Sequence, residues 1–195
     1  MIVLASQSAS RRAMLLAAGV AFEATAAGVD EDAAKAALAH LLPRDLADAL
    51  AELKAVKISR REPEALVLGC DSVVALDDGS LLDKPIDRDD AARQLRLMSG
   101  TRHSLYSAAV IAEDGRPTWR FVDRAVLHVR PLTDAFIDAY LDVEWPAIAG
   151  CVGCYRLEGP GAQLFSRIEG SHFTILGLPL LPVLDHLRVR GVLTS

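Results

Sequence analysis

Apolar residues form one long run near the middle of the chain, over Ala65–Leu76. Its many Val and Leu residues are typical of a strand buried on both faces of a sheet. A shorter run at Ile2–Ala5 predicts a second buried strand. Two further segments, His103–Ala112 and Thr118–Val129, flank a polar turn at 113–116 and predict a β-hairpin.

Segments of helical composition lie between these strands without strict alternation. One runs from Asp89, with acidic residues at its start, to Met98, just before Gly100, as helix ends prefer. Thr133 is the expected N-cap of a helix that ends at Val143. The other predicted helices are Arg11–Ala18, Asp32–His40, Asp45–Arg60 and Leu178–Arg190, and the other predicted strands are Phe22–Thr25, Ser80–Leu82 and Ala162–Ile168. This order predicts an α/β fold, in which helices flank a mixed sheet.

The overall composition excludes several classes of function. The chain has 195 residues, 51% of them hydrophobic, which is enough for one domain with a sizeable core. Its 21 basic and 26 acidic residues give a formal net charge of −5, which argues against a broad basic surface for nucleic acid. No apolar run reaches the roughly 20 residues of a membrane span. We therefore expect a single domain over residues 1–195 that binds neither nucleic acid nor a membrane.

The N-terminus and the cysteines predict a cytoplasmic location. The apolar residues MIVLAS precede Arg11 and Arg12, whereas a signal peptide carries its basic residues first. Three cysteines, an odd number, argue against a disulfide framework. Cys151 and Cys154 have the C-x-x-C spacing of a redox or zinc site, but no second pair of ligands is near them in the sequence. We interpret them as small buried residues.

The loop between the first strand and the first helix is a candidate phosphate site. It carries the hydroxyls of Ser6, Ser8 and Ser10, followed by Arg11 and Arg12. Helix N-termini bind anions through unpaired N–H groups, and hydroxyls and guanidinium groups add donors that suit phosphate oxygens. A capped helix that begins with two solvated arginines explains the same residues equally well on spacing alone.

Asp71 interrupts the long apolar strand. A carboxylate inside a buried strand is costly unless a cation, a metal or several donors accompany it, so we expect such a partner. Only four of the 21 basic residues are lysines, namely Lys35, Lys54, Lys57 and Lys84. Because arginine serves elsewhere, a lysine here suggests a need for a compact ammonium group.

Lys84 follows a turn and short strand that continue from the strand of Asp71, so we expect the two side chains to converge near one end of the sheet. Lys54 lies on a predicted helix, where an ordinary surface lysine is the alternative. Glu31 precedes a predicted helix, where an acid that favours the helix start is the alternative.

Together these stretches resemble the Maf family of nucleoside triphosphate pyrophosphatases. The match runs in the family's order over almost the whole chain, and although each motif is weak, the ordered set is highly specific. The matching segments are Leu4–Arg12 (LASQSASRR), Val29–Glu31 (VDE), Leu50–Ala55 (LAELKA), Gly69–Val74 (GCDSVV), Asp83–Pro85 (DKP), Met98–His103 (MSGTRH), Leu157–Gly161 (LEGPG), Ile168–Gly170 (IEG) and Gly177–Leu180 (GLPL).

The resemblance implies an elongated Maf/ITPase-like α/β fold with a twisted mixed sheet, two lobes around a cleft, and often a homodimer. It implies hydrolysis of a nucleoside triphosphate to the monophosphate and pyrophosphate with a divalent metal, Mg²⁺ or Mn²⁺. Asp71 matches the catalytic acid and Glu31 its companion carboxylate, and these two would hold the metal. Lys54 and Lys84 match phosphate-contacting lysines, and Ser6 and Arg11 match the phosphate-loop serine and arginine.

The resemblance implies no single preferred base, because this chain departs from the better-known members at Ser10 and Ser72. The dTTP/UTP type has arginine and the 7-methyl-GTP type tryptophan where Ser10 stands, and Ser72 replaces threonine or glutamine. Glu158 matches the 7-methyl-GTP type, and a carboxylate suits the N–H donors of a guanine edge. Ser10, however, cannot stack on a cationic base as an aromatic residue would.

We therefore expect a pyrophosphatase that clears a nucleoside triphosphate, with modified nucleotides among the candidate substrates and a weak preference away from strict dTTP/UTP specificity. Three alternatives stay open. They are a 7-methyl-GTP-specific pyrophosphatase, a nucleotide-binding regulator of cell division with little turnover, and a phosphatase that removes only the terminal phosphate.

Overall fold

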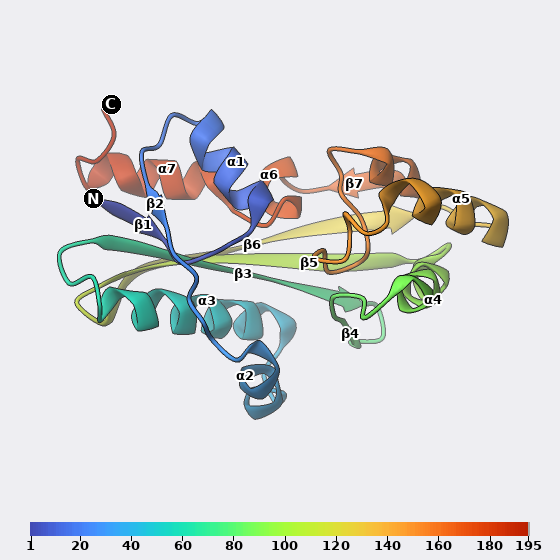
Figure 1. The fold of residues 1–195 in the computed structure, drawn as a ribbon, viewed down its shortest axis with the longest axis horizontal. Helices are drawn as coiled ribbons and strands as arrows, with labels where there is room; N and C mark the ends of the chain where they lie inside the picture. The colour runs from blue at the N-terminus through green and yellow to red at the C-terminus, as the bar shows by residue number, and fades with distance from the viewer. Residues whose placement is uncertain (195) are drawn as a thin grey trace. The chain divides into compact units, whose positions relative to one another are not determined.

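The structure, a computed structural model, describes residues 1–194. In this part of the chain seven strands form one sheet in the order β2-β1-β3-β5-β6-β7, and β4 pairs with β3 (Figure 1). Strand β1 is parallel to β2 and β3, whereas β4 is antiparallel to β3 and β7 is antiparallel to β6. The strands are β1 (Ile2–Leu4), β2 (Glu23–Ala24), β3 (Leu66–Leu76), β4 (Leu81–Leu82), β5 (Arg102–Glu113), β6 (Arg116–Val129) and β7 (Phe165–Glu169).

The helices come between the strands in the irregular order that the sequence predicts. They are α1 (Ala9–Ala17), α2 (Glu31–Ala37), α3 (Pro43–Ser59), α4 (Arg88–Met98), α5 (Asp134–Glu144), α6 (His172–Ile175) and α7 (Leu180–Val189), with a 3₁₀ helix at Pro160–Leu164. Thr133 caps α5 by accepting a hydrogen bond from the backbone N–H of Phe136, as predicted. The predicted mixed α/β fold is confirmed.

Contacts divide the chain into two compact units, each built from separate segments. Unit 1 comprises Met1–Ser72, Tyr106–Asp123 and the chain from His172 onward, and unit 2 comprises Val73–Leu105 and Arg124–Ser171. This division agrees with the two lobes that the resemblance implies. A single domain over residues 1–195 stays a prediction.

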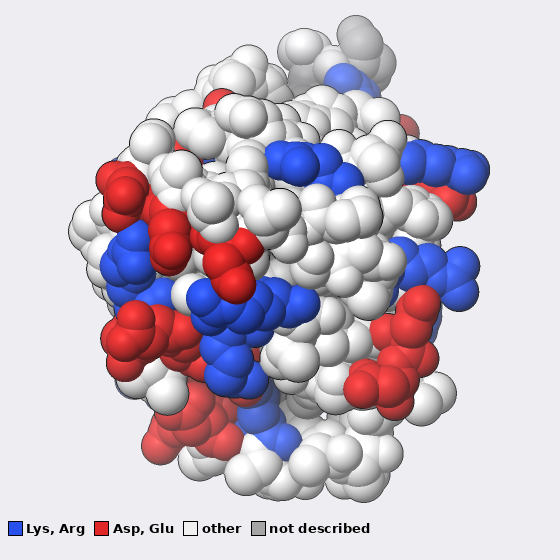
Figure 2. Space-filling model, turned by 90° about the vertical axis from the view of Figure 1, so that its right-hand side faces the viewer, with Lys and Arg blue, Asp and Glu red and all other residues white. Residues whose placement is uncertain are grey.

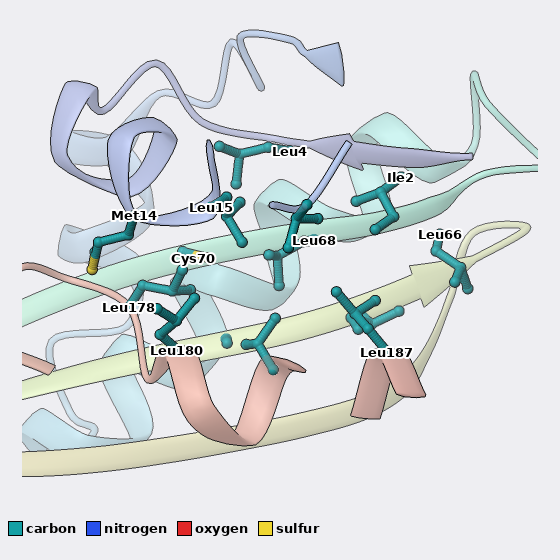
Figure 3. Close-up of a cluster of buried hydrophobic side chains, with 14 residues drawn as sticks. Ile2, Leu4, Met14, Leu15, Leu66, Leu68, Cys70, Leu178, Leu180 and Leu187 are labelled. Atoms are coloured by element: carbon teal, nitrogen blue, oxygen red, sulfur yellow. The ribbon is translucent and has the colours of Figure 1, made fainter. Parts of the chain in front are cut away.

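In unit 1, alternate residues of β1 and β3 face two different layers of helix. Ile2, Leu4 and Leu68 point into a core that helices α1 and α7 complete (Figure 3). Val3 and Val67, one position along, belong to a second core that includes Ile58 of α3. Because successive side chains of a strand point to opposite faces, this double burial explains why β3 reads as a continuous apolar run.

Helix α3 lies directly against β3 at Gly69. A Cβ atom on Gly69 would lie 2.3 Å from the carbonyl oxygen of Ala51 and 2.6 Å from the backbone nitrogen of Ala55, too close for any side chain. Asp71, two residues along the strand, points to the same face as Gly69. The close approach of the helix therefore brings residues of α3 within reach of the Asp71 carboxylate.

Unit 2 is built largely around α4 and α5, which contact each other. Ion pairs connect their exposed sides, with Arg88 Nη2 2.6 Å from Asp142 Oδ1 and Arg96 Nε 2.7 Å from Asp134 Oδ1. On the face that Figure 2 shows, Lys and Arg side chains likewise lie beside Asp and Glu side chains. Charge there is mixed rather than gathered into one field.

The predicted hairpin is confirmed, and its turn residues Asp114 and Gly115 have φ values of 44° and 73°, as a two-residue hairpin turn requires. The predicted strand Ala162–Ile168 is wrong in its first half. Residues 162–164 belong to the 3₁₀ helix that Pro160 starts, and the strand begins at Phe165. Within the described residues, none of the helices is long and apolar enough to cross a membrane.

Candidate active site

The serine-rich loop connects the end of β1 to the start of α1 in unit 1. Its first residue, Ala5, donates a backbone hydrogen bond to the carbonyl of Leu68, so the loop begins beside β3. Ser8 is the N-cap of α1, and its hydroxyl accepts a hydrogen bond from the backbone N–H of Arg11 at 3.4 Å. Ser6 Oγ in turn accepts from the Ser8 backbone N–H at 3.2 Å. Ser10 lies half-buried in the first turn of the helix.

Arg11 is held against the protein rather than solvated. Its Nε donates to the carbonyl of Gly177 at 2.7 Å, Nη1 to Ser6 Oγ at 3.2 Å and Nη2 to Ser72 Oγ at 3.1 Å. The interpretation of two solvated arginines is therefore wrong for Arg11, although Arg12 is exposed. The helix start is both capped and equipped with a fixed guanidinium group.

Asp71 has the cationic partner that its burial demands. Lys54 Nζ, from α3, lies 2.5 Å from Asp71 Oδ1 and 2.7 Å from Glu31 Oε1. The Lys54 and Asp71 side chains are only 9% and 8% exposed, whereas that of Glu31 is 34% exposed. The ammonium group neutralises the buried Asp71 carboxylate, whose unpaired charge would be strongly destabilising, and also contacts the more exposed Glu31. Lys54 is not an ordinary surface lysine.

The neighbouring thiol reports the electrostatics of this region. Burial raises the pKa of Cys70 to about 11, while the positive charges of Arg11 and Lys54 oppose the rise and the charge of Asp71 adds to it. Cys70 thus lies within electrostatic range of both cations and of the carboxylate. Cys70 and Ser72 point to one face of β3, and Asp71 points to the other. One face therefore carries an arginine cluster, made of Arg11 and the residues that hold it, and the other face carries a lysine–carboxylate cluster, made of Lys54, Asp71 and Glu31.

Lys84 and Glu158 belong to unit 2. Both are exposed, Lys84 just after β4 and Glu158 in the loop before the 3₁₀ helix. They act on the same thiol, because burial raises the pKa of Cys151, the Glu158 charge raises it further, and the Lys84 charge lowers it. The structure therefore brings these two side chains into one electrostatic neighbourhood. The convergence of Lys84 with Asp71 stays a prediction.

Cysteines 151 and 154 are free thiols, as is Cys70. Cys154 is fully buried, and its Sγ lies 3.5 Å from Oε1 of Gln94. Burial raises its pKa to about 12, which leaves the thiol protonated and unreactive at neutral pH. Their interpretation as buried small residues holds for Cys154, while Cys151 is half-buried.

Two residues of the arginine cluster were not among the predicted site residues. Gly177 supplies a carbonyl to Arg11, and the hydroxyl of Ser107 lies 2.8 Å from that of Ser72. Ser107 is fully buried in the apolar strand β5. A hydroxyl in an apolar strand is the same kind of signal that singles out Asp71, although it is weaker because serine is small and uncharged.

A family model described as "Maf-like protein" matches residues 1–190. A nucleoside triphosphate pyrophosphatase of Sphingopyxis alaskensis is 55% identical over 193 residues, which are 98% of this chain and 98% of that protein. A protein of the same name from Caulobacter vibrioides is 53% identical over 195 residues, 99% of this chain and 97% of its own. A 7-methyl-GTP pyrophosphatase of Mesorhizobium japonicum is 46% identical over 194 residues, 98% and 97% of the two chains.

These matches extend over nearly the whole length of both chains in each comparison, so they include the serine-rich loop, β3 and α3 as well as the segments of unit 2. The resemblance found in the sequence is thereby confirmed, and the chain belongs to the Maf-like protein family.

Proposed function

We propose that the protein hydrolyses a nucleoside triphosphate to the nucleoside monophosphate and pyrophosphate. The observation that carries the proposal is the buried cluster in which Lys54 joins the carboxylates of Asp71 and Glu31. Paired carboxylates beside a fixed cation suit a reaction in which water attacks a highly charged phosphate chain. The relatives that are named nucleoside triphosphate pyrophosphatases support the same activity.

The residues present fit a divalent metal that arrives with the substrate. Within the described residues, no group of three or more His, Cys, Asp or Glu side chains is placed to hold an ion. Mg²⁺ rarely needs such a group, because it keeps several waters and binds one or two carboxylates together with substrate phosphates. Glu31 and Asp71 would be those carboxylates. When bound, the metal would offset phosphate charge and polarise the phosphoryl group.

We assign the chemical step to Asp71, whose carboxylate orients the attacking water and accepts its proton. Lys54 holds this carboxylate in place by donating a 2.5 Å hydrogen bond to its Oδ1. Arg11, with the hydroxyls of Ser6, Ser8 and Ser10, binds phosphate oxygens at the start of α1. Lys84 contributes a further positive charge toward the leaving pyrophosphate.

Glu158 is our candidate for recognition of the base. Its carboxylate accepts hydrogen bonds only, so it favours a base edge that presents N–H donors, as guanine does. The relative named 7-methyl-GTP pyrophosphatase makes methylated guanine a reasonable member of the substrate panel. The three thiols are free, which fits a reducing compartment, and we propose the cytoplasm.

The test is a panel of standard and methylated nucleoside triphosphates with Mg²⁺ or Mn²⁺, analysed for every product. We expect monophosphate and pyrophosphate in equal amounts. Diphosphate and orthophosphate would instead indicate a terminal phosphatase, and tight nucleotide binding without products would indicate a regulator. Both results would contradict the proposal.

Asp71→Asn tests the chemical role in the same assay. The variant keeps a hydrogen-bonding oxygen but loses the negative charge, so turnover should fall by at least a thousandfold while nucleotide binding stays measurable. Asp48→Asn is the matched control, because Asp48 is also a partly buried acid of unit 1, paired with Arg120 at 2.5 Å. It should leave turnover unchanged.

A further inference from the structure

The three contacts of Arg11 leave it with a defined set of donors. A guanidinium group has five N–H bonds, one on Nε and two on each Nη. Gly177, Ser6 and Ser72 each take one, from Nε, Nη1 and Nη2 respectively. One N–H then remains on each terminal nitrogen, and these two donors can serve phosphate oxygens.

The direction of the hydrogen bonds behind Arg11 is also fixed. Ser107 Oγ lies 2.7 Å from the carbonyl oxygen of Thr174, which only accepts, so Ser107 donates there. A hydroxyl has one hydrogen, so in the 2.8 Å contact between the two serines Ser72 is the donor. Ser72 in turn accepts from Arg11. The chain therefore runs from Arg11 through Ser72 and Ser107 to the backbone of α6.

This direction determines what Ser72 contributes. Its only hydroxyl proton points to Ser107, so Ser72 has no proton to donate to a nucleotide. Its oxygen instead holds one nitrogen of the guanidinium group. Hydrogen bonds in such a chain polarise one another, so loss of the buried acceptor Ser107 weakens the bond that Arg11 makes.

The backbone beyond α6 closes the other side of the cluster. Gly177 has φ of 96°, a conformation that side chains rarely adopt. A Cβ there would lie 3.3 Å from both Arg11 Nε and Ser72 Oγ. The glycine thus allows its carbonyl and its Cα to approach the guanidinium group and the serine together.

We propose that Ser107 is a positioning residue for the phosphate-binding arginine. It fixes Ser72, which with Gly177 and Ser6 fixes Arg11 so that its two remaining N–H bonds face the substrate. This inference rests on the proposed function only in naming the ligand as a nucleoside triphosphate. A preorganised fork loses less freedom on binding than an arginine that must find its geometry.

Ser107→Ala tests the proposal through a double-mutant cycle with Arg11→Lys. Lysine keeps the positive charge but cannot make the three fixed contacts. In the wild-type background Ser107→Ala should lower kcat/KM about tenfold, mainly through KM, and Ser72→Ala should do the same. In the Arg11→Lys background Ser107→Ala should have no further effect. A full tenfold loss in that background, or no loss in the wild-type background, would overturn the proposal.

The control is Ser59→Ala, which removes another fully buried serine of unit 1. Ser59→Ala should lower the melting temperature without changing KM. If Ser107 were purely structural, Ser107→Ala would behave in the same way. The same double-mutant cycle is then repeated with the binding affinity for inorganic tripolyphosphate, measured by calorimetric titration, so that it does not depend on turnover. If no nucleotide is hydrolysed but the cycle holds for tripolyphosphate, the proposed function fails and the positioning role stands. If tripolyphosphate binding is also insensitive to Ser107→Ala, the positioning role fails.

Discussion

The carboxylate of Glu144 is 2% exposed and receives two parallel hydrogen bonds from Arg156, one from Nε to Oε2 and one from Nη2 to Oε1, both at 2.9 Å. This pair anchors the loop after α5 to the end of that helix. Glu158, the residue that we assign to base recognition, follows Arg156 by two positions. A bidentate pair that fixes the chain two residues before Glu158 is the arrangement expected for a residue that must present its side chain in one orientation.

Arg156→Ala should therefore destabilise the protein strongly. It leaves a buried carboxylate without its cation, which costs about 3 kcal/mol of the free energy of unfolding, or somewhat less because the Arg156 side chain is 37% exposed. Urea denaturation measures the loss, and Arg156→Lys should recover only part of it. Arg93→Ala is the control, since Arg93 is 63% exposed in its pair with Asp90 and should cost less than about 1 kcal/mol. Equal losses would contradict the assignment.

Stability should also fall in mild acid because of His103. This ring is fully buried, with Nε2 2.9 Å from the Tyr155 hydroxyl, and burial lowers its pKa from 6.5 to about 4. Between these two values the unfolded chain binds a proton that the folded chain does not, so the free energy of unfolding rises with pH and is lost as the pH falls. From pH 7.5 to 5 the group should contribute a loss of about 2 kcal/mol.

His103→Gln tests this prediction, because the variant lacks the titrating group. The difference in the free energy of unfolding between wild type and variant should shrink by about that amount between pH 7.5 and 5. This window lies above the titration of Glu113, whose pKa the hydrogen bond from Arg190 lowers to about 2. A constant difference across the window would show that His103 does not stay neutral in the folded protein.

The sequence predicts the buried part of the site better than it predicts the contacts within it. Burying an acid inside an apolar strand costs free energy, so the sequence alone marks Asp71 as a candidate site residue. The need for a cationic partner follows from the same cost. The burial of Lys54 can also be predicted from the sequence, because Lys54 lies at helical spacing from Leu50, Ala51 and Ile58, which are all buried on α3. The hairpin follows from Asp114 and Gly115, which tolerate positive φ.

The contacts of Arg11 cannot be predicted from the sequence in this way. Gly177 is 166 positions away along the chain, and its carbonyl meets Arg11 only because the segment before α7 returns to unit 1. The predicted start of β7 is wrong for a local reason. Gly161, inside the 3₁₀ helix Pro160–Leu164, lies so close to the backbone of Arg156 that a Cβ would be 2.5 Å from its carbonyl oxygen. Composition carries no signal of either contact.

The three thiols should differ sharply in reactivity. Burial raises the pKa of Cys70 to about 11 and that of Cys154 to about 12, so neither offers a thiolate at pH 8. Cys151 is half-buried and its pKa is also raised, so it should react slowly with an alkylating reagent and should be the one thiol of the folded protein that reacts. Mass spectrometry after iodoacetamide treatment should find at most one label on the folded protein and three after denaturation. Cys151→Ser should abolish the native label, and a labelled Cys70 in the folded protein would contradict the structure.

Gly69→Ala should damage stability and activity together. The new Cβ would lie 2.3 Å from the Ala51 carbonyl oxygen and 2.8 Å from the Ala55 Cβ, so α3 must move away from β3. Overpacking of this kind costs about 1–3 kcal/mol, and contact with backbone atoms places it at the upper end. The same movement separates Lys54 from Asp71, so kcat should fall by more than the loss of folded protein explains, when measured well below the melting temperature. Gly150→Ala is the matched control, because a Cβ there meets nothing within 4 Å and should change neither quantity. A destabilised Gly69→Ala enzyme with full kcat would show that the helix–strand spacing does not govern the lysine–carboxylate cluster.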